Sequence, residues 1–192
     1  MGNFRLIKSG IDVTAAVAQL DGQPDLWDTR VDRLSYLGPH RETSDIWVRF
    51  RDPRHLTSAE SYREPHLSVW YPAWHALPAL RPIVFDLASC VEATHIGGVL
   101  ITKIPAGGRV YEHDDRGGWH SEYHDAKVWI PLRANDGCLN HCEGDTVIME
   151  AGTAWTFSNL KRHSVENRGA TERVCLIVCF RSCDADESQN RA

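Results

Sequence analysis

The sequence predicts a mainly β fold, an antiparallel sandwich or barrel with helices in its N-terminal part. Short runs rich in β-branched and aromatic residues follow one another over residues 97–181. Turn signals containing glycine, proline, asparagine or aspartate separate these runs, as in sandwiches and barrels. The clearest helical pattern of the chain precedes this region.

The first ninety residues predict two helices and one strand. Residues 12–20, DVTAAVAQL, are alanine-rich and begin at an aspartate that can cap a helix. Residues 45–50, DIWVRF, alternate in the manner of a strand. Residues 79–92 repeat apolar side chains at steps of four, three and four, which predicts an amphipathic helix.

Residues 51–78, between that strand and the second helix, are rich in proline, histidine and aromatic side chains and predict long ordered loops. Trp70, Tyr71 and Trp74 lie close together there. They either cover an edge of the core or form a wall of a substrate pocket.

The strands of the β core follow from residue 97. Residues 99–106 and 127–134 are β-rich runs that end at Pro and Gly or at Asn-Asp-Gly. Two hairpins are predicted. The predicted pairs are 146–150 with 153–158, about Ala151-Gly152, and 163–167 with 172–181, about Arg168-Gly169.

Length and composition indicate one domain over residues 1–183, with a polar tail at 184–192 that we expect to be disordered. The formal net charge of -5 does not favour binding to nucleic acid. No apolar run reaches the roughly 18 residues of a membrane span. The first residues lack the apolar stretch of a signal peptide, so we expect a cytoplasmic protein whose six cysteines are reduced thiols.

The stretch VYEHDDRGG, residues 110–118, contains a histidine and two acids after an apolar run. Positions i and i+2 of a strand face the same side, so His113 and Asp115 can point to one place while Asp114 points away. This spacing supplies two of the three ligands of a two-histidine, one-carboxylate metal site. Alone, the motif reads equally well as an acidic surface turn.

His163 is the best candidate for the third ligand because it starts a late strand, where a ligand can face a cavity. The hairpin predicted about residue 168 sets His163 opposite Arg173, on the same face. A guanidinium beside the metal ligands would clamp a carboxylate. Such a pocket suits iron(II) with 2-oxoglutarate, whose keto acid chelates the metal while its distal carboxylate needs a cation.

These motifs resemble those of the iron(II)/2-oxoglutarate-dependent dioxygenases, and more narrowly of the aspartyl/asparaginyl β-hydroxylase family with its small bacterial and phage members. The stretches SDIWVRF, WYPAW, LRPIVFDL, GGVLITKIPAGG, EHDD, GWH and HSVENRG...ERVCLIV occur in the expected order over roughly residues 25–181. The resemblance implies a double-stranded β-helix (jelly-roll) core with N-terminal helices packed outside. It implies hydroxylation with iron(II), 2-oxoglutarate and O2.

By position, the resemblance implies that His113, Asp115 and His163 bind iron and that Arg173 binds the distal carboxylate of 2-oxoglutarate. Lys127 falls where the family often has a basic residue facing the cosubstrate; the alternative is a solvated lysine at a strand start. Trp129 stands where many members have a histidine, so the contacts to 2-oxoglutarate at this position differ.

Several residues are candidate substrate contacts. Trp119 and His120 lie in GGWHSEYHD, a segment that we expect to be a loop rather than a helix pairing His120 with His124 around a metal. Asn159 and Arg162 precede His163 and are expected at the pocket mouth, where Arg162 would meet an acidic substrate group.

Three functions remain open. The first is a hydroxylase of a free amino acid or similar small molecule. The second is a hydroxylase of a protein or peptide side chain such as Asp or Asn. The third is a non-oxidative, cupin-like metal protein, which would not require Arg173.

Overall fold

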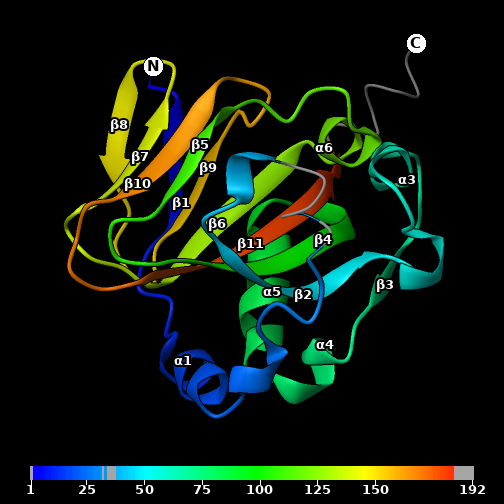
Figure 1. Cartoon of the computed structure of the whole chain (residues 1–192), viewed down its shortest axis with the longest axis horizontal. Coiled ribbons are helices and arrows are strands. Elements are labelled where there is room, and N and C mark those ends of the chain that lie inside the picture. Colours follow the sequence, from blue (N-terminus) through cyan, green and yellow to red (C-terminus); the bar gives the residue numbers. More distant parts are fainter. Residues whose placement is uncertain (1, 32, 34–37, 184–192) are drawn as a thin grey trace.

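The computed structural model describes residues 2–31, 33 and 38–183. It consists of two antiparallel β-sheets that face each other (Figure 1). The larger sheet has seven strands in the order β1 (Phe4–Lys8), β9 (Ala154–Phe157), β6 (Ala126–Arg133), β11 (Arg173–Ser182), β4 (Ala93–Ile104), β2 (Ser44–Arg51) and β3 (Ser68–Trp70). The smaller sheet has the order β5 (Arg109–His113), β10 (His163–Asn167), β7 (Cys138–Cys142) and β8 (Asp145–Ile148).

From β4 to β11 the chain changes sheet at every step except the β7–β8 hairpin. This alternate winding is that of a double-stranded β-helix, or jelly roll, and the predicted fold class is confirmed. The principal helices are α1 (Thr14–Asp21) and α5 (Leu80–Cys90). Shorter helical segments are η1 (Pro24–Leu26), η2 (Gly38–His40), η3 (Pro53–His55), α3 (Ala59–Arg63), α4 (Ala73–Ala76) and α6 (Trp119–Tyr123).

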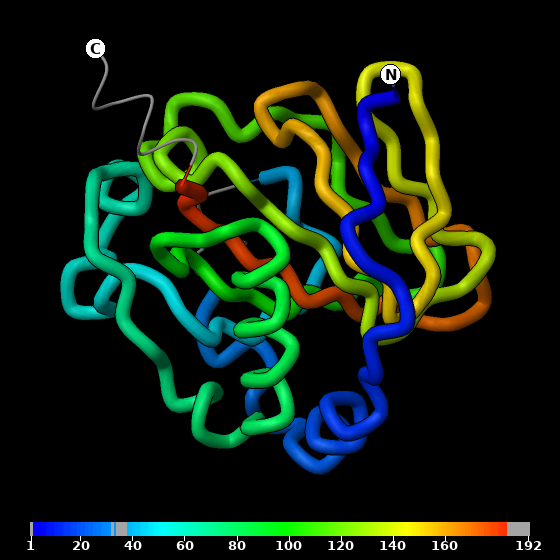
Figure 2. The backbone as a smooth tube through the Cα atoms, turned by 180° about the vertical axis from the view of Figure 1, so that it is seen from behind, coloured from blue at the N-terminus to red at the C-terminus, as the bar shows by residue number. Residues whose placement is uncertain are grey.

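The seven-stranded sheet has an apolar side chain layer on each face. Its outer face packs against α1, α4 and α5, and Figure 2 shows α5 crossing the sheet on this side. Leu80, Val84 and Leu87 of α5 are fully buried there, as the predicted apolar stripe requires. The inner face carries Leu100, Ile177 and other side chains that pack in the space between the sheets. The site lies on this inner side.

Both predicted hairpins are wrong. β8 pairs with β7, whereas β9 pairs with β1 and β6 in the other sheet. Likewise β10 pairs with β5 and β7, whereas β11 pairs with β4 and β6. The turn residues do reverse the chain, but each turn carries it across to the opposite sheet.

The segment 51–78 is also more regular than predicted, since it contains η3, α3, β3 and α4. Trp70 stacks on Trp74, with ring centroids 3.9 Å apart, and both pack on the outer core. Tyr71 belongs to the inner cluster. These aromatics therefore cover edges of the core. The predicted disordered tail, 184–192, lies outside the described residues.

The predicted helix at 12–20 and the predicted strands at 45–50 and 127–134 are confirmed within about two residues of their observed ends. The strand predicted at 99–106 is the second part of β4, which already begins at Ala93. All six cysteines are free thiols. In the described part of the chain, no helix is long and apolar enough to cross a membrane.

Burial of the α5 stripe leads to a stability prediction. Leu87→Ala removes a side chain with no exposed surface and should lower the free energy of unfolding by about 2–5 kcal/mol. Phe85→Ala, on the same helix but 55% exposed, should cost well under half as much. Urea unfolding measures both. Equal losses would contradict the packing described for α5.

Candidate metal centre and cavity

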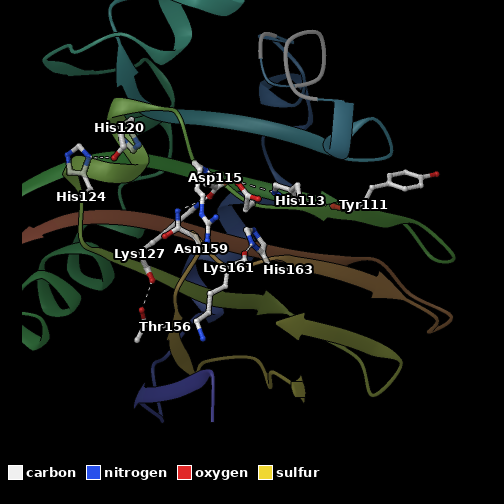
Figure 3. Close-up of polar contacts among 12 residues, drawn as sticks. Tyr111, His113, Asp115, His120, His124, Lys127, Thr156, Asn159, Lys161 and His163 are labelled. Atoms are coloured by element: carbon white, nitrogen blue, oxygen red, sulfur yellow. Dashed lines mark hydrogen bonds and ion pairs between the residues drawn. The ribbon is translucent and has the colours of Figure 1, made fainter. Parts of the chain in front are cut away.

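The side-by-side strands β5 and β10 bring two histidines together. His163 lies directly opposite His113 in the strand register, and the centroids of their rings are 4.3 Å apart. Asp115 follows β5, and its backbone N–H donates to the carbonyl oxygen of Asn159 at 3.0 Å. One ligand atom from each of His113, Asp115 and His163 lies within 4.8 Å of the other two. Figure 3 shows the three side chains turned toward one another.

Each imidazole is oriented by a hydrogen bond on its far side. Nδ1 of His113 is 2.7 Å from the carbonyl oxygen of Tyr111, and Nδ1 of His163 is 2.8 Å from that of Lys161. A carbonyl only accepts, so Nδ1 carries the proton in both rings and Nε2 keeps its lone pair. The two Nε2 atoms are therefore free to bind a metal.

The carboxylate of Asp115 is anchored in a comparable way. Its Oδ2 accepts from the ammonium of Lys127 at 2.6 Å and from the amide of Asn159 at 2.9 Å. Its Oδ1 lies 3.6 Å from Nε2 of His113. One oxygen is thus held by the protein while the other faces the histidines.

The protonation states suit metal binding. Burial lowers the pKa of His163 to about 4 and also lowers the pKa of His113. Burial acts to raise the pKa of Asp115, but Lys127, His163 and the hydrogen bond from Asn159 outweigh it and hold this pKa well below its usual range. At neutral pH the site therefore offers two neutral imidazoles and one carboxylate, the forms in which these groups bind metals.

Two histidines and one carboxylate converging from one side are the ligand set of non-haem iron(II) oxygenases. Within the described ranges, this is the one group of three or more His, Cys, Asp or Glu side chains close enough to hold an ion. The donor types and their free atoms fit iron(II).

A cavity of about 280 Å³ adjoins these residues. His113, Asp115 and Lys127 line it beside an apolar wall. The wall consists of Trp47, Phe50, Leu100 and Ile177. Polar groups from η2, α3 and α6 complete the lining.

Arg173 is not paired with His163, contrary to the prediction, because the two residues lie in opposite sheets. It nevertheless lies on the same face of β11 as Ile177, which lines the cavity. Its Nη2 donates across the barrel to Oδ1 of Asn140 at 3.2 Å. Asn140 pairs with Val165, two residues beyond His163 on β10. Arg173 therefore lies between the sheets, on the side of the predicted ligands.

The guanidinium of Arg173 is a buried charge without a counter-ion. The residue is 2% exposed, and no carboxylate of the described residues lies within 4.0 Å of it. A buried charge without a counter-ion is costly in free energy. Arg173 does not line the 280 Å³ cavity itself but lies farther along the same strand face.

Thr102 is a residue that the sequence reasoning missed. Thr102 lies on β4, opposite Cys175 of β11, and Cys175 is two positions from Arg173. Thr102 is 2% exposed. Its hydroxyl oxygen is buried without a hydrogen-bond partner. A lone hydroxyl within the aliphatic run VLITKI was the available signal.

Lys127 and Trp129 both lie on the inner side of β6. Lys127 is held in the ion pair with Asp115, so it is not the solvated lysine of the alternative interpretation. Trp129 stacks on Phe157, with centroids 3.9 Å apart, and Phe157 in turn packs against the ring of His163 at 5.2 Å. Contact of either residue with 2-oxoglutarate stays a prediction.

The segment expected to be a loop forms the short helix α6, which packs on the glycine pair 97–98. His120 lines the cavity, and its Nε2 accepts from the N–H of Gly98 at 2.8 Å. A Cβ on Gly98 would come within 2.9 Å of that nitrogen, so a larger residue there would have to displace the ring of His120. Trp119 stacks on Tyr123 and is not part of the cavity lining.

The remaining candidates lie elsewhere than predicted. Arg162 lies just before β10, and its exposed side chain pairs with Glu112 at the surface, at 2.7 Å. Asn159 does not line the cavity; its side-chain amide donates a hydrogen bond to the carboxylate of Asp115. Asp114 lines the cavity instead of pointing away, because β5 ends at His113 and strand alternation no longer applies.

The comparisons with known proteins agree with this geometry. The family model of the aspartyl/asparaginyl β-hydroxylases matches residues 69–182. No curated protein matches the chain in sequence.

Among solved structures, a prolyl hydroxylase from Trichoplax adhaerens, in complex with a hypoxia inducible factor peptide fragment, has a TM-score of 0.59 at 13% identity. The match covers 97% of this chain and 86% of that one. A 2OG-Fe(II) oxygenase family oxidoreductase from Burkholderia pseudomallei has a TM-score of 0.52 at 16% identity, covering 88% and 90%. A Pseudomonas putida prolyl-4-hydroxylase has a TM-score of 0.51 at 16% identity, and the match covers 94% of this chain and 92% of that one. At these identities the likeness establishes the fold.

The anchored donors predict a selective loss of metal affinity. Asp115→Ala should weaken cobalt(II) or iron(II) binding at least about tenfold, because it removes a ligand and leaves Lys127 unpaired. Asp114→Ala, the adjacent acid outside the ligand set, should keep nearly full affinity. Anaerobic calorimetric titration distinguishes the two. The ligand assignment would be wrong if both variants bound metal equally.

Proposed function

Because the chain belongs to the aspartyl/asparaginyl β-hydroxylase family, we propose that it uses iron(II) and 2-oxoglutarate to hydroxylate an unactivated C–H bond of an amino acid or amino-acid residue. Membership makes the chain a 2-oxoglutarate-dependent dioxygenase of the hydroxylase type. The substrate and the carbon that reacts belong to the proposal. The observation that carries it is the buried, unpaired Arg173 behind an anchored two-histidine, one-carboxylate ligand set.

His113, Asp115 and His163 would hold iron(II) through Nε2, Oδ1 and Nε2. Together with 2-oxoglutarate and O2, bound iron would supply the oxidation that yields succinate, CO2 and a hydroxylated product. The protein contributes position and protonation state. The backbone carbonyls keep Nε2 of each imidazole unprotonated, and Lys127 with Asn159 keeps the carboxylate from rotating.

Arg173 would bind the distal carboxylate of 2-oxoglutarate between the two sheets. Its guanidinium can donate two parallel hydrogen bonds to a carboxylate, and the unpartnered hydroxyl of Thr102 can donate a third. Both groups are buried and lack an anion in the described residues, so the ligand would supply the acceptors that the protein omits. We also propose that Lys127 and Trp129, on the inner side of β6, contact 2-oxoglutarate.

The apolar wall of the cavity would receive the substrate carbon. Phe50, Leu100 and Ile177 offer little to a polar group but shield a C–H bond and exclude water. A cavity of about 280 Å³ admits a free amino acid or one side chain of a peptide. A non-oxidative cupin-like protein that binds no oxoacid would not require a buried cation at Arg173.

The proposal is tested by succinate formation from 2-oxoglutarate in the presence of iron(II), ascorbate and O2. Arg173→Gln should raise the KM for 2-oxoglutarate at least about tenfold, since losing a charge-assisted hydrogen bond costs about 1.5–3 kcal/mol. Arg168→Gln removes an exposed arginine paired with Glu166 and should leave that KM unchanged.

Two results would count against the proposal. One is a protein that neither binds 2-oxoglutarate nor converts it to succinate when loaded with iron. The other is an Arg173→Gln variant with an unchanged KM for 2-oxoglutarate, which would reject the carboxylate clamp while leaving the metal site in place.

A further inference from the structure

Two arginines lie at the opening of the cavity, away from the predicted metal ligands. Arg63 is the last residue of α3, and Arg116 lies in the segment after β5. Both line the cavity and both are exposed, so they lie where it meets solvent. We call this pair the arginine rim.

Neither guanidinium of the arginine rim has a carboxylate partner among the described residues. Within the described residues, no carboxylate lies within 4.0 Å of either guanidinium. Glu64, the neighbour of Arg63, pairs instead with Arg51 at 3.1 Å. The carboxylate of Asp114 accepts from the backbone N–H of Arg116 and not from its guanidinium.

The other cations of the cavity differ in this respect. Lys127 is paired with Asp115 at 2.6 Å, and Arg33 is paired with the fully buried Asp45 at 3.2 Å. These two cations form ion pairs within the protein, whereas the guanidinium groups of the arginine rim lie at the opening of the cavity. The chain as a whole has a formal net charge of -5, so this local positive potential runs against its average.

The cavity is thus divided by chemistry. At its opening are two guanidinium groups that no carboxylate of the described ranges pairs with, and farther in are the apolar side chains of Trp47, Leu100 and Ile177 beside the predicted metal ligands. A molecule anchored at the opening by an anionic group would extend its carbon chain along the apolar wall toward His113. Guanidinium groups bind carboxylates in a fixed, bidentate geometry, which positions what lies beyond them.

We propose that the arginine rim binds a carboxylate of the substrate and thereby selects acids whose carbon chain enters the apolar part of the cavity. This inference rests on the proposed function. The carboxylate can belong to a free amino acid or to an Asp or Glu side chain of a peptide, and the two sources share the same recognition chemistry.

The test compares acids with their neutral derivatives. The panel contains the free L-amino acids, their α-methyl esters, and short peptides with acetylated and amidated ends that contain Asp, Glu, Asn or Gln. Each is incubated with iron(II), ascorbate, 2-oxoglutarate and O2, and mass spectrometry detects the gain of one oxygen. Succinate is measured in parallel.

We expect the oxidised compounds to carry a carboxylate, with kcat/KM at least about tenfold above that of the matched ester or amide. Oxidation of free acids identifies an amino-acid substrate, and oxidation of only the Asp or Glu peptides identifies a side chain. The ratio should fall as ionic strength rises, because the rim is exposed.

The variant Arg63→Gln/Arg116→Gln should bring the ratio of acid to neutral derivative close to one. Arg54→Gln, an exposed arginine on η3 outside the cavity, should keep the wild-type ratio. A misfolded variant would lower kcat/KM for the acid and for its neutral derivative together. A change in the ratio of the two values is therefore not a folding effect.

The inference is overturned if succinate forms from 2-oxoglutarate but no carboxylate of the panel is oxidised. It is also overturned if esters and acids react equally well, or if the double variant keeps the wild-type ratio. Absence of both succinate formation and 2-oxoglutarate binding would instead reject the proposed function itself.

Discussion

The antiparallel pairing of β5 with β10 is the interaction on which the candidate site depends. It sets His113 opposite His163, so that backbone geometry alone brings two imidazoles together. The Nδ1–H of each ring donates to the carbonyl oxygen two residues earlier in the chain, which leaves both Nε2 atoms free to bind a metal. Asp115 lies two residues beyond the end of β5 and supplies the third donor. Two hydrogen bonds with Asn159 fix its position. Loss of this pairing would separate all three groups.

Charge is distributed in the barrel according to the ligand that each part would hold. Asp115 and Lys127 form an ion pair within the protein, whereas in the part of the chain that the structure describes the buried Arg173 has no anionic partner and the hydroxyl of Thr102 has no hydrogen-bond partner. Unmet polar groups in a core lower stability, so they are expected where a ligand completes them. The cavity with the apolar wall opens at the arginine rim, whereas Arg173 lies outside the cavity lining, farther along the inner face of β11.

Much of the fold and of the site follows from the sequence, but the partners of the strands do not. Local periodicity gives the helices and most strands, because it reports which face of each segment is buried. Turn residues do not encode which sheet the next strand joins, and both hairpins were therefore mispredicted. The predicted pairing of Arg173 with His163 does not exist. Arg173 lies between the sheets because its side chain is on the inner face of β11. Asp114 was misplaced because alternation was extended beyond the end of β5.

The most direct test is a crystal structure with manganese(II), as a redox-inert stand-in for iron, and 2-oxoglutarate. We expect metal density bound by Nε2 of His113 and His163 and by Oδ1 of Asp115, with the distal carboxylate of 2-oxoglutarate on Arg173. Metal bound at His120 and His124 instead, or 2-oxoglutarate with its distal carboxylate away from Arg173, would contradict this expectation.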